Sequence, residues 1–356
     1  MNDTPPLTDF NRRGFLRKAA AVSALMPLGS GSAVAQTASG HGSHDQVNNR
    51  VVGEVNHGAN GFDPHKMLWD FDVGTVSTMT DGRILREWTI TAVDHEFEVA
   101  PGIKFAGWSY NGRIPGPTLR CTEGERLRIR FINGSTHPHS MHFHGIHSAR
   151  MDGVAGASLV APGEEFTYEF DAKPFGCHLY HCHAIPLKRH IHKGLYGVFI
   201  VDPDPAKHPE ARDVAASRLL GSPENGQWQE MVMVMNAFDT NFDDENEFYC
   251  VNTIPFVYFD KPIRVEKARP IRIYLVNMTE FDPINSVHMH ANFFDFYDHG
   301  TTLTPTHRTI DTVMMCQAQR GIIEMSFAEH EPGLYMFHAH QSEFAELGWM
   351  SHFEVV

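Results

Sequence analysis

The sequence contains no low-complexity tract, and after residue 35 it contains no apolar run long enough for a membrane-spanning helix. It is also short of positive charge, since 29 Lys and Arg residues stand against 43 Asp and Glu residues, for a net charge of −14. With 42% hydrophobic and 20% charged residues, the composition excludes disorder over most of the chain. Phosphate backbones and anionic lipid surfaces repel a body this acidic, so we expect neither nucleic acid nor a membrane among its partners.

The first 35 residues have the pattern of an export signal. The paired arginines Arg12 and Arg13 precede a short apolar stretch from Ala19 to Leu28, and small residues end the segment at Ala35. This order predicts a twin-arginine signal peptide, and the apolar stretch is too short to cross a bilayer. We therefore expect a periplasmic or secreted protein.

The remaining chain is predicted to be all-β. Short runs of alternating apolar and polar residues, such as Arg126 to Ile132, are separated by turn residues such as Asn111-Gly112. Alternation with a period of two and frequent breaks is typical of β-sandwiches. Helical periodicity is confined to residues 206–220.

The sequence also repeats itself once. The segment Arg126–Asn133 matches Pro270–Asn277, His139–His144 matches Asn285–His290, and Leu179–His183 matches Met336–His340. The repeat predicts two homologous β-sandwich domains. The expected organisation is a signal peptide (1–35), an N-terminal arm (36–79) that is mobile to about residue 65, domain 1 (80–203), a linker (204–227) and domain 2 (228–356).

Histidines are concentrated in four His-x-His pairs, two in each repeat. Residues i and i+2 of a strand face the same side, so each pair can present two imidazoles to one point. A lone histidine is more often a core or surface residue. Eight histidines at matching positions instead predict a transition-metal site. Imidazole suits copper, zinc, iron and nickel, so the choice of metal stays open at this point. The pairs are His142 and His144, His181 and His183, His288 and His290, and His338 and His340.

Cys182, in the middle of the second pair, narrows the choice of metal. A thiolate with two histidines and a weak or absent axial ligand is the blue-copper arrangement. We expect His139 as one nitrogen ligand and His190 as the other, because four residues separate His190 from Leu195 at the axial position; His192 is the alternative. Leucine cannot coordinate a metal, which favours a high reduction potential.

Together these motifs resemble those of the multicopper oxidases. The resemblance covers residues 108–203 and 228–356 and also rests on the segment Asn111–Thr118. It implies two cupredoxin-like Greek-key β-sandwich domains and four copper ions per active unit: one type 1, one type 2 and a type 3 pair. By position it assigns the type 1 copper to His139, Cys182 and His190, the type 2 copper to His142 and His288, and the type 3 pair to His144, His181, His183, His290, His338 and His340.

The resemblance further implies a laccase-like activity. Such an enzyme oxidises a phenolic, aromatic or metal-ion donor one electron at a time and reduces O2 to water. In the second repeat Asn285 and Ala339 replace His139 and Cys182, as in two-domain enzymes with type 1 copper in domain 1 only. That class resembles a homotrimer that shares each cluster between neighbouring chains. Each repeat offers four of the eight ligands, so the halves must meet, within one chain or between chains.

A carboxylate is also expected near the metal cluster, to deliver protons. Asp152 matches the family's cluster-side carboxylate, although an aspartate before glycine can also be an ordinary turn residue. Glu343 and Glu346, just past His340, are weaker candidates that could equally be solvated charges.

Two other functions fit parts of these motifs. A copper nitrite reductase resembles this chain, but that family has aspartate at the position of His142 and no histidine at the position of His183. A periplasmic copper buffer or electron carrier needs only part of the site. The remaining cysteines predict either two disulfides, Cys121 with Cys177 and Cys250 with Cys316, or free buried thiols.

Overall fold

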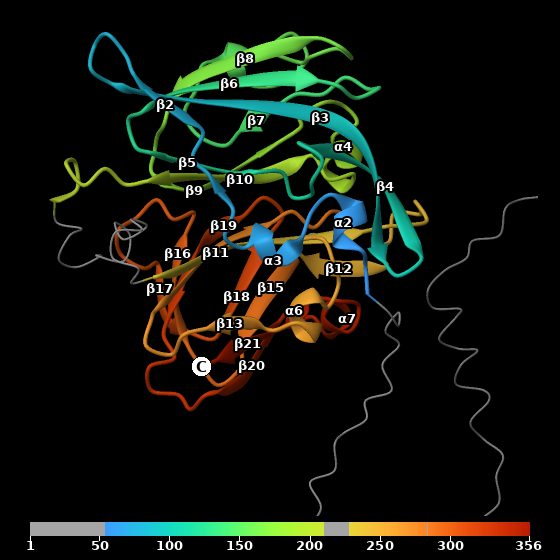
Figure 1. Ribbon diagram of the computed structural model, residues 1–356, viewed down its shortest axis with the longest axis vertical. Coiled ribbons are helices and arrows are strands. Elements are labelled where there is room, and N and C mark those ends of the chain that lie inside the picture. The colour runs from blue at the N-terminus through green and yellow to red at the C-terminus, as the bar shows by residue number, and fades with distance from the viewer. Residues whose placement is uncertain (1–53, 210–227, 283) are drawn as a thin grey trace, which may run out of the picture. The chain divides into compact units, whose positions relative to one another are not determined.

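The computed structural model describes residues 54–209, 228–282 and 284–356 (Figure 1). The predicted signal peptide, the first part of the predicted arm and most of the predicted linker lie outside these residues. The structure is mostly β, with 48% strand and 10% helix, which confirms the predicted all-β class. Among the described residues, no helix has the length and apolar character needed to cross a bilayer.

Domain 1 consists of two sheets packed around one core. The first sheet has the order β1 (Phe71–Asp72), β5 (Thr118–Thr122), β10 (Tyr196–Asp202), β9 (Gly176–His181) and β7 (His142–Phe143). The second has the order β2 (Thr75–Thr78), β3 (Ile84–Ala100), β6 (Arg126–Asn133) and β8 (Glu165–Asp171), and β4 (Ile103–Tyr110) pairs with β3. Buried side chains such as Leu127 and Tyr168 from one sheet and Leu119 and Phe199 from the other form the core between them.

Domain 2 repeats this arrangement. One sheet has the order β12 (Phe248–Val251), β11 (Gln229–Phe238), β14 (Ile271–Asn277), β19 (Arg320–Met325), β16 (Phe294–Asp298) and β17 (His307–Ile310). The other has the order β13 (Ile263–Val265), β21 (Met350–Val355), β20 (Gly333–His338), β15 (Ile284–Met289) and β18 (Thr312–Cys316).

The same strand order therefore occurs twice. The series β3-β6-β8 corresponds to β11-β14-β19, and β5-β10-β9-β7 corresponds to β13-β21-β20-β15. In each of these four series the first pair of strands is parallel and the second pair is antiparallel. The repeat seen in the sequence thus places matching histidine motifs on matching strands, β7 and β9 in domain 1 and β15 and β20 in domain 2.

The helices within the described residues are short; the first two precede β1, and the others lie between strands. They are α2 (His57–Asn60), α3 (Pro64–Met67), α4 (Leu187–His192), α6 (Val257–Asp260), α7 (Ser342–Glu346) and the 3-10 helix η1 (Ala149–Met151). Of these, α4 follows the His-Cys-His motif directly and contributes to the site.

The described part of the N-terminal arm packs against the core from Val55 onward, unlike the mobile segment expected to about residue 65. The backbone N–H of Val232 donates to the carbonyl of Leu68 at 2.9 Å, and the Tyr258 hydroxyl donates to the carbonyl of Pro64 at 2.7 Å. Leu68 is fully buried, and Phe62 joins the same core. These apolar side chains, set among polar residues, outweigh the Gly- and His-rich composition that suggested mobility.

Neither of the two considered disulfides is formed. Cys121 on β5 and Cys177 on β9 lie on opposite sides of β10, where their partners are Val201 and Ile200. Residues on strands that are separated by one intervening strand lie about 10 Å apart, and this exceeds the roughly 7 Å between Cα atoms that a disulfide can bridge. The other pair is divided between different sheets, on β12 and β18.

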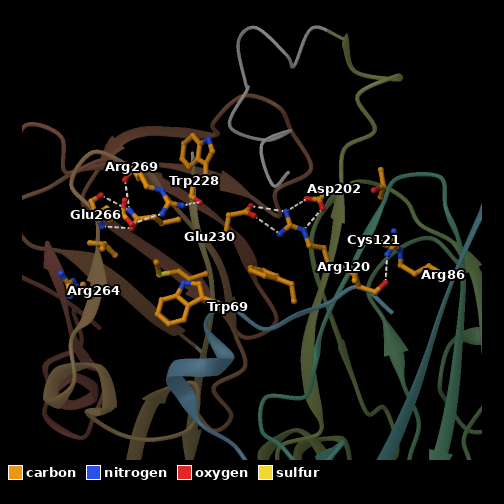
Figure 2. Close-up of a pocket in the computed structure, with 16 residues that line it drawn as sticks. Trp69, Arg86, Arg120, Cys121, Asp202, Trp228, Glu230, Arg264, Glu266 and Arg269 are labelled. Carbon is orange, nitrogen blue, oxygen red and sulfur yellow. Dashed lines mark hydrogen bonds and ion pairs between the residues drawn. The ribbon is translucent and has the colours of Figure 1, made fainter. Parts of the chain in front are cut away.

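The two domains are joined by a shared apolar cluster and by buried ion pairs. Figure 2 shows Arg120 between Asp202 and Glu230, in the wall of a cavity of about 690 Å³. The guanidinium donates to Asp202 at 2.7 Å and to Glu230 at 2.9 Å. Glu230 also accepts from Arg272 at 2.9 Å, and Arg272 is fully buried. Glu230 is thus the link between an arginine of domain 1 and an arginine of domain 2.

We predict that Glu230→Gln costs about 1–3 kcal/mol of stability, because Arg120 and Arg272 each lose one charged partner while Asp202 and Glu324 still pair with them. Burial opposes ionisation, yet Arg120 and Arg272 hold the pKa of Glu230 below its ordinary value. This stabilisation is complete above pH 4.5 and is lost as the pH falls through the lower folded-state pKa. Urea denaturation at several pH values measures both effects. Arg264→Gln, an exposed change in the same cavity wall, should stay within about 0.5 kcal/mol of wild type.

Candidate metal centres

The motif His181-Cys182-His183 lies where β9 ends beside β10. The backbone N–H of Cys182 donates to the carbonyl of Leu195 at 2.9 Å, which fixes this end of the strand. The rings of His181 and His183 both contact the ring of His142, at centroid distances of 5.2 and 5.1 Å. The sulfur between them points to a different set of residues, as the alternation of an extended chain requires.

That second set, the cysteine centre, consists of His139, Cys182 and His190. The Cys182 Sγ lies 3.2 Å from His190 Nδ1 and 3.8 Å from His139 Nδ1, and the two nitrogens are 3.1 Å apart. All three residues are buried. Three donor atoms thus converge on one point from three segments of domain 1.

His190, the favoured candidate, lies at this point and His192 does not. Both are on α4, where residues two apart are turned by about 200° and so face opposite sides. The Nε2 of His192 instead accepts the backbone N–H of Asp239 in domain 2, at 3.1 Å. Because His190 and His192 lie on a short helix and not on a strand, they face opposite sides and contact different groups.

The protonation states of the cysteine centre suit a soft metal ion. Burial lowers the pKa of His139 to about 3 and that of His190 to about 4, so both imidazoles are neutral at pH 7 and keep a lone pair. Burial also raises the pKa of the Cys182 thiol, and a bound metal ion would remove its proton. One sulfur and two neutral imidazole nitrogens are donors that fit copper.

Outer residues hold His139 in place. Its Nε2 lies 2.9 Å from the Ser135 Oγ, and that hydroxyl donates to Asp94 at 2.6 Å. A hydrogen bond at Nε2 leaves Nδ1 to face the sulfur, as is usual for metal-binding histidines. No pattern in the sequence points to Asp94, which lies on β3.

Beside the cysteine centre is an apolar cavity of about 400 Å³. Its lining includes His190, Trp108, Ile185 and Arg189. The Trp108 ring packs against both imidazoles of the centre, at centroid distances of 5.0 Å to His139 and 4.8 Å to His190. The edge of His190 is therefore the part of the centre closest to an entering molecule.

The domain 1 half-site consists of His142, His144, His181 and His183. The Nε2 atoms of His144 and His181 are 3.1 Å apart. Burial, with the neighbouring His181 and Arg320, lowers the pKa of His144 to about 2, and burial lowers that of His181 to about 4. These rings are therefore neutral donors as well.

Asp152 contacts this half-site directly. The Nδ1 of His142 is 2.8 Å from the Asp152 carbonyl oxygen and 3.2 Å from its carboxylate. This leaves the Nε2 of His142 turned toward the other rings. Glu343 and Glu346 are instead exposed on α7.

The domain 2 half-site has the same construction. The ring of His288 contacts the rings of His290, His338 and His340 at centroid distances of 5.1 to 5.5 Å. The Nε2 atoms of His290 and His338 are 2.9 Å apart. The Nδ1 of His288 lies 3.1 Å from the carbonyl of Asp311. Asp311 takes the place that Asp152 has in domain 1, a correspondence that the sequence did not reveal.

Within the described residues, ring contacts join the histidines of each half-site, and none joins one half-site to the other. Exposed apolar side chains flank both: Ile146 is 57% and Ile185 86% exposed in domain 1, and Phe293 is 56% and Met314 66% exposed in domain 2. The chain thus presents two separate sets of four imidazoles, each bordered by apolar surface.

In domain 2 the position of the cysteine centre is filled without metal donors. Asn285 and Ala339, which match His139 and Cys182, are both fully buried. The Asn285 amide donates to the Thr279 hydroxyl at 2.9 Å, in the way that His139 contacts Ser135. Domain 2 therefore has the buried polar contact at this position but no sulfur.

The architecture and the donor sets define a two-domain cupredoxin-type protein with metal-binding half-sites. Two family models described as multicopper oxidase match residues 93–206 and 227–356. A solved structure described as a multicopper oxidase is 54% identical, covers 85% of this chain and 100% of its own, and superposes with a TM-score of 0.77. The chain belongs to the multicopper oxidase family, which implies copper as the metal.

Curated relatives match shorter segments. The copper-containing nitrite reductase of Neisseria meningitidis is 34% identical over 113 residues, 31% of this chain and 29% of the relative. Laccase-20 of Oryza sativa subsp. japonica is 32% identical over 143 residues, 38% of this chain and 23% of the relative. The matches therefore span less than a third of these relatives.

We predict that His190→Ala abolishes the blue absorption of the copper-loaded protein, because it removes one of three donors. His192→Ala should keep the blue band, since that ring contacts Asp239 rather than Cys182. Visible spectra of both variants after copper loading test this assignment. A blue His190→Ala protein together with a colourless His192→Ala protein would reverse it.

Proposed function

We propose that this protein is a laccase-like multicopper oxidase that couples one-electron oxidation of a phenolic, aromatic or metal-ion donor to reduction of O2 to water. One observation carries the proposal. Cys182 belongs to the cysteine centre, while its neighbours His181 and His183 belong to the domain 1 half-site. A single strand end therefore connects a donor-side site with an oxygen-side site.

We further propose four copper ions per active unit. His139, Cys182 and His190 hold the type 1 copper, His142 and His288 the type 2 copper, and the type 3 pair is held by His144, His181, His183, His290, His338 and His340. When bound, copper supplies one-electron redox chemistry at the first site and O2 reduction at the cluster. The apolar cavity beside His190 admits the donor, and Trp108 and Ile185 give it an apolar wall. With copper bound, the few backbone bonds between the Cys182 sulfur and the two flanking imidazoles would supply the path for electrons.

Asp152 is the proposed proton relay. Its contact with His142 supports this role, because the carboxylate lies next to a cluster ligand. Its side chain is 39% exposed, so water can return the proton that it gives up.

We propose that the cluster is completed between chains, in a homotrimer where domain 1 of one chain meets domain 2 of the next. The separation of the two half-sites supports this, as do the exposed apolar side chains around them, since such patches mark interaction surfaces. Cyclic symmetry lets every chain use both of its half-sites. The N-terminal twin-arginine pattern supports export to the periplasm or outside the cell.

A nitrite reductase is the second candidate, favoured by the match to the Neisseria meningitidis enzyme. That function needs two coppers per chain rather than four. The close contact of His183 with His142 supports the oxidase, because the reductase has neither histidine.

We predict that Cys182→Ser loses the blue band and lowers O2 consumption by more than about 100-fold, since even outer partners of metal ligands change activity 10- to 100-fold. His288→Ala should stay blue but lose O2 consumption to a similar extent, because His288 belongs to the half-site and not to the cysteine centre. An oxygen electrode with a phenolic donor measures turnover. The exposed controls Cys316→Ser and His307→Ala should match wild type. Full activity in His288→Ala contradicts the proposed cluster.

A complementation experiment tests the shared cluster. A variant with His144→Ala and His181→Ala keeps only the domain 2 half-site, and one with His288→Ala and His290→Ala keeps only the domain 1 half-site. Each is expected to be inactive alone. Co-expressed in equal amounts, they should recover about a quarter of the wild-type activity, the share of interfaces at which two intact halves meet. No recovery in mixed trimers of confirmed composition points to a cluster within one chain.

A further inference from the structure

The cavity beside the cysteine centre is apolar on nearly every side. Of the twelve residues that line its volume of about 400 Å³, eight are apolar, among them Trp108 and Leu159. Three more are histidines, and two of these, His183 and His190, belong to the proposed copper sites. The twelfth is Arg189, which precedes His190 on α4. A cavity of this size and lining suits one small aromatic molecule that is oriented by a single polar group.

Arg189 is exposed and has no carboxylate partner among the described residues. Lys188, its neighbour on the same helix, pairs with Asp244 at 2.8 Å, and no ion pair of this kind includes Arg189. Its guanidinium is therefore open to an incoming anion, and a guanidinium matches a carboxylate in both shape and charge.

Other charges near the cavity balance one another. Trp108 also borders a second cavity, whose lining residues and their ion-pair partners comprise two carboxylates and two lysines: Asp94, Glu96, Lys193 and Lys104. The chain as a whole carries a net charge of −14, but charges further away than about 8 Å are largely screened at physiological ionic strength. Arg189 therefore sets the sign of the charge that a donor meets at this cavity.

The lining does not suit a metal-ion donor. Carboxylate oxygens suit Mn(II), sites for Fe(II) combine them with imidazole, and soft sulfur ligands suit Cu(I). No Asp, Glu, Met or Cys is among the residues that line this cavity. The one imidazole of the lining that is not a proposed copper ligand is that of His137, and the positive charge of Arg189 repels a cation there.

We propose that the electron donor is a phenol that carries an anionic group, such as a carboxylate, on its ring. The ring lies in the apolar cavity with its hydroxyl toward His190, and the carboxylate pairs with Arg189. Each oxidation removes one electron, which goes to the cysteine centre, and the hydroxyl proton, which goes to water. The donor then leaves as a phenoxyl radical with its carboxylate unchanged. The inference rests on the proposed oxidase function and names its substrate class.

The test uses three phenols that share one methoxyphenol ring and differ in charge: vanillate is anionic, vanillyl alcohol neutral and vanillylamine cationic. Each is mixed with the copper-loaded protein without oxygen, and the rate constant for bleaching of the blue band is measured, so that O2 reduction plays no part. In Arg189→Gln the rate constant for vanillate should fall about 3- to 10-fold relative to that for vanillyl alcohol, between the effects of an exposed and a buried charge pair. In Arg189→Glu the relative fall should reach about 10- to 100-fold, and vanillylamine should gain relative to the alcohol.

The matched controls are Lys188→Gln and Lys188→Glu. Lys188 is on the same helix and undergoes the same change of charge, but it does not line the cavity. Both controls should keep the ratio of the vanillate and vanillyl alcohol rate constants within about 2-fold of wild type, because an exposed charge outside the cavity contributes little. A second measurement follows binding alone: veratrate, in which the phenol is methylated, should bind the copper-loaded protein by calorimetry and bind more weakly in Arg189→Gln.

An equal change for all three phenols in Arg189→Glu would overturn the inference, because it would report an altered reduction potential or structure rather than recognition of charge. The inference is also wrong if the Lys188 controls change the ratio as much, or if veratrate does not bind or binds equally well without Arg189. A protein with no blue band, or with a blue band that none of the phenols bleaches, would instead refute the proposed function.

Discussion

The alternation of side chains along an extended chain is the constraint on which both centres depend. At the end of β9 it sends Cys182 to one side and His181 and His183 to the other. Two chemically different sites are thereby built on three consecutive residues. The sulfur lies among buried groups next to an apolar cavity, and the imidazoles lie at an edge that the chain leaves open. No motion of the protein is needed to connect them, since the connection is covalent.

The separation of the two half-sites follows from the repeat. Matching strands, β7 with β9 and β15 with β20, carry matching His-x-His pairs, so each domain builds the same four-imidazole surface. Two such surfaces on successive domains of a chain meet each other only where both lie at the boundary between the domains. Within the described residues no ring contact joins them. The proposed assembly of several chains would bring a domain 1 half-site and a domain 2 half-site together.

Much of the fold and of the candidate site could be predicted from the sequence, because side-chain alternation, the internal repeat and metal-ligand spacing can be read from the sequence directly. The all-β class and the grouping of the histidines needed no more than that. The choice of His190 over His192 depended on a short helix, where the two-residue period of a strand does not apply. Asp94 and Arg320 could not be predicted, since Arg320 lies 176 residues from His144 and meets it only through packing of the two domains. The packing of the arm was not predicted either, because its few apolar residues stand in a segment that is polar overall.

Domain 2 shows which parts of the site belong to the fold and which to the metal. Where domain 1 has His139 against Ser135, domain 2 has Asn285 against Thr279, with the same 2.9 Å separation. A buried polar group needs such a partner whether or not a metal is present. Ala339 fills the place of the cysteine without disturbing the flanking histidines, because its side chain points away from them. A domain can therefore keep the half-site without the cysteine centre, and among the described residues that centre is found in domain 1.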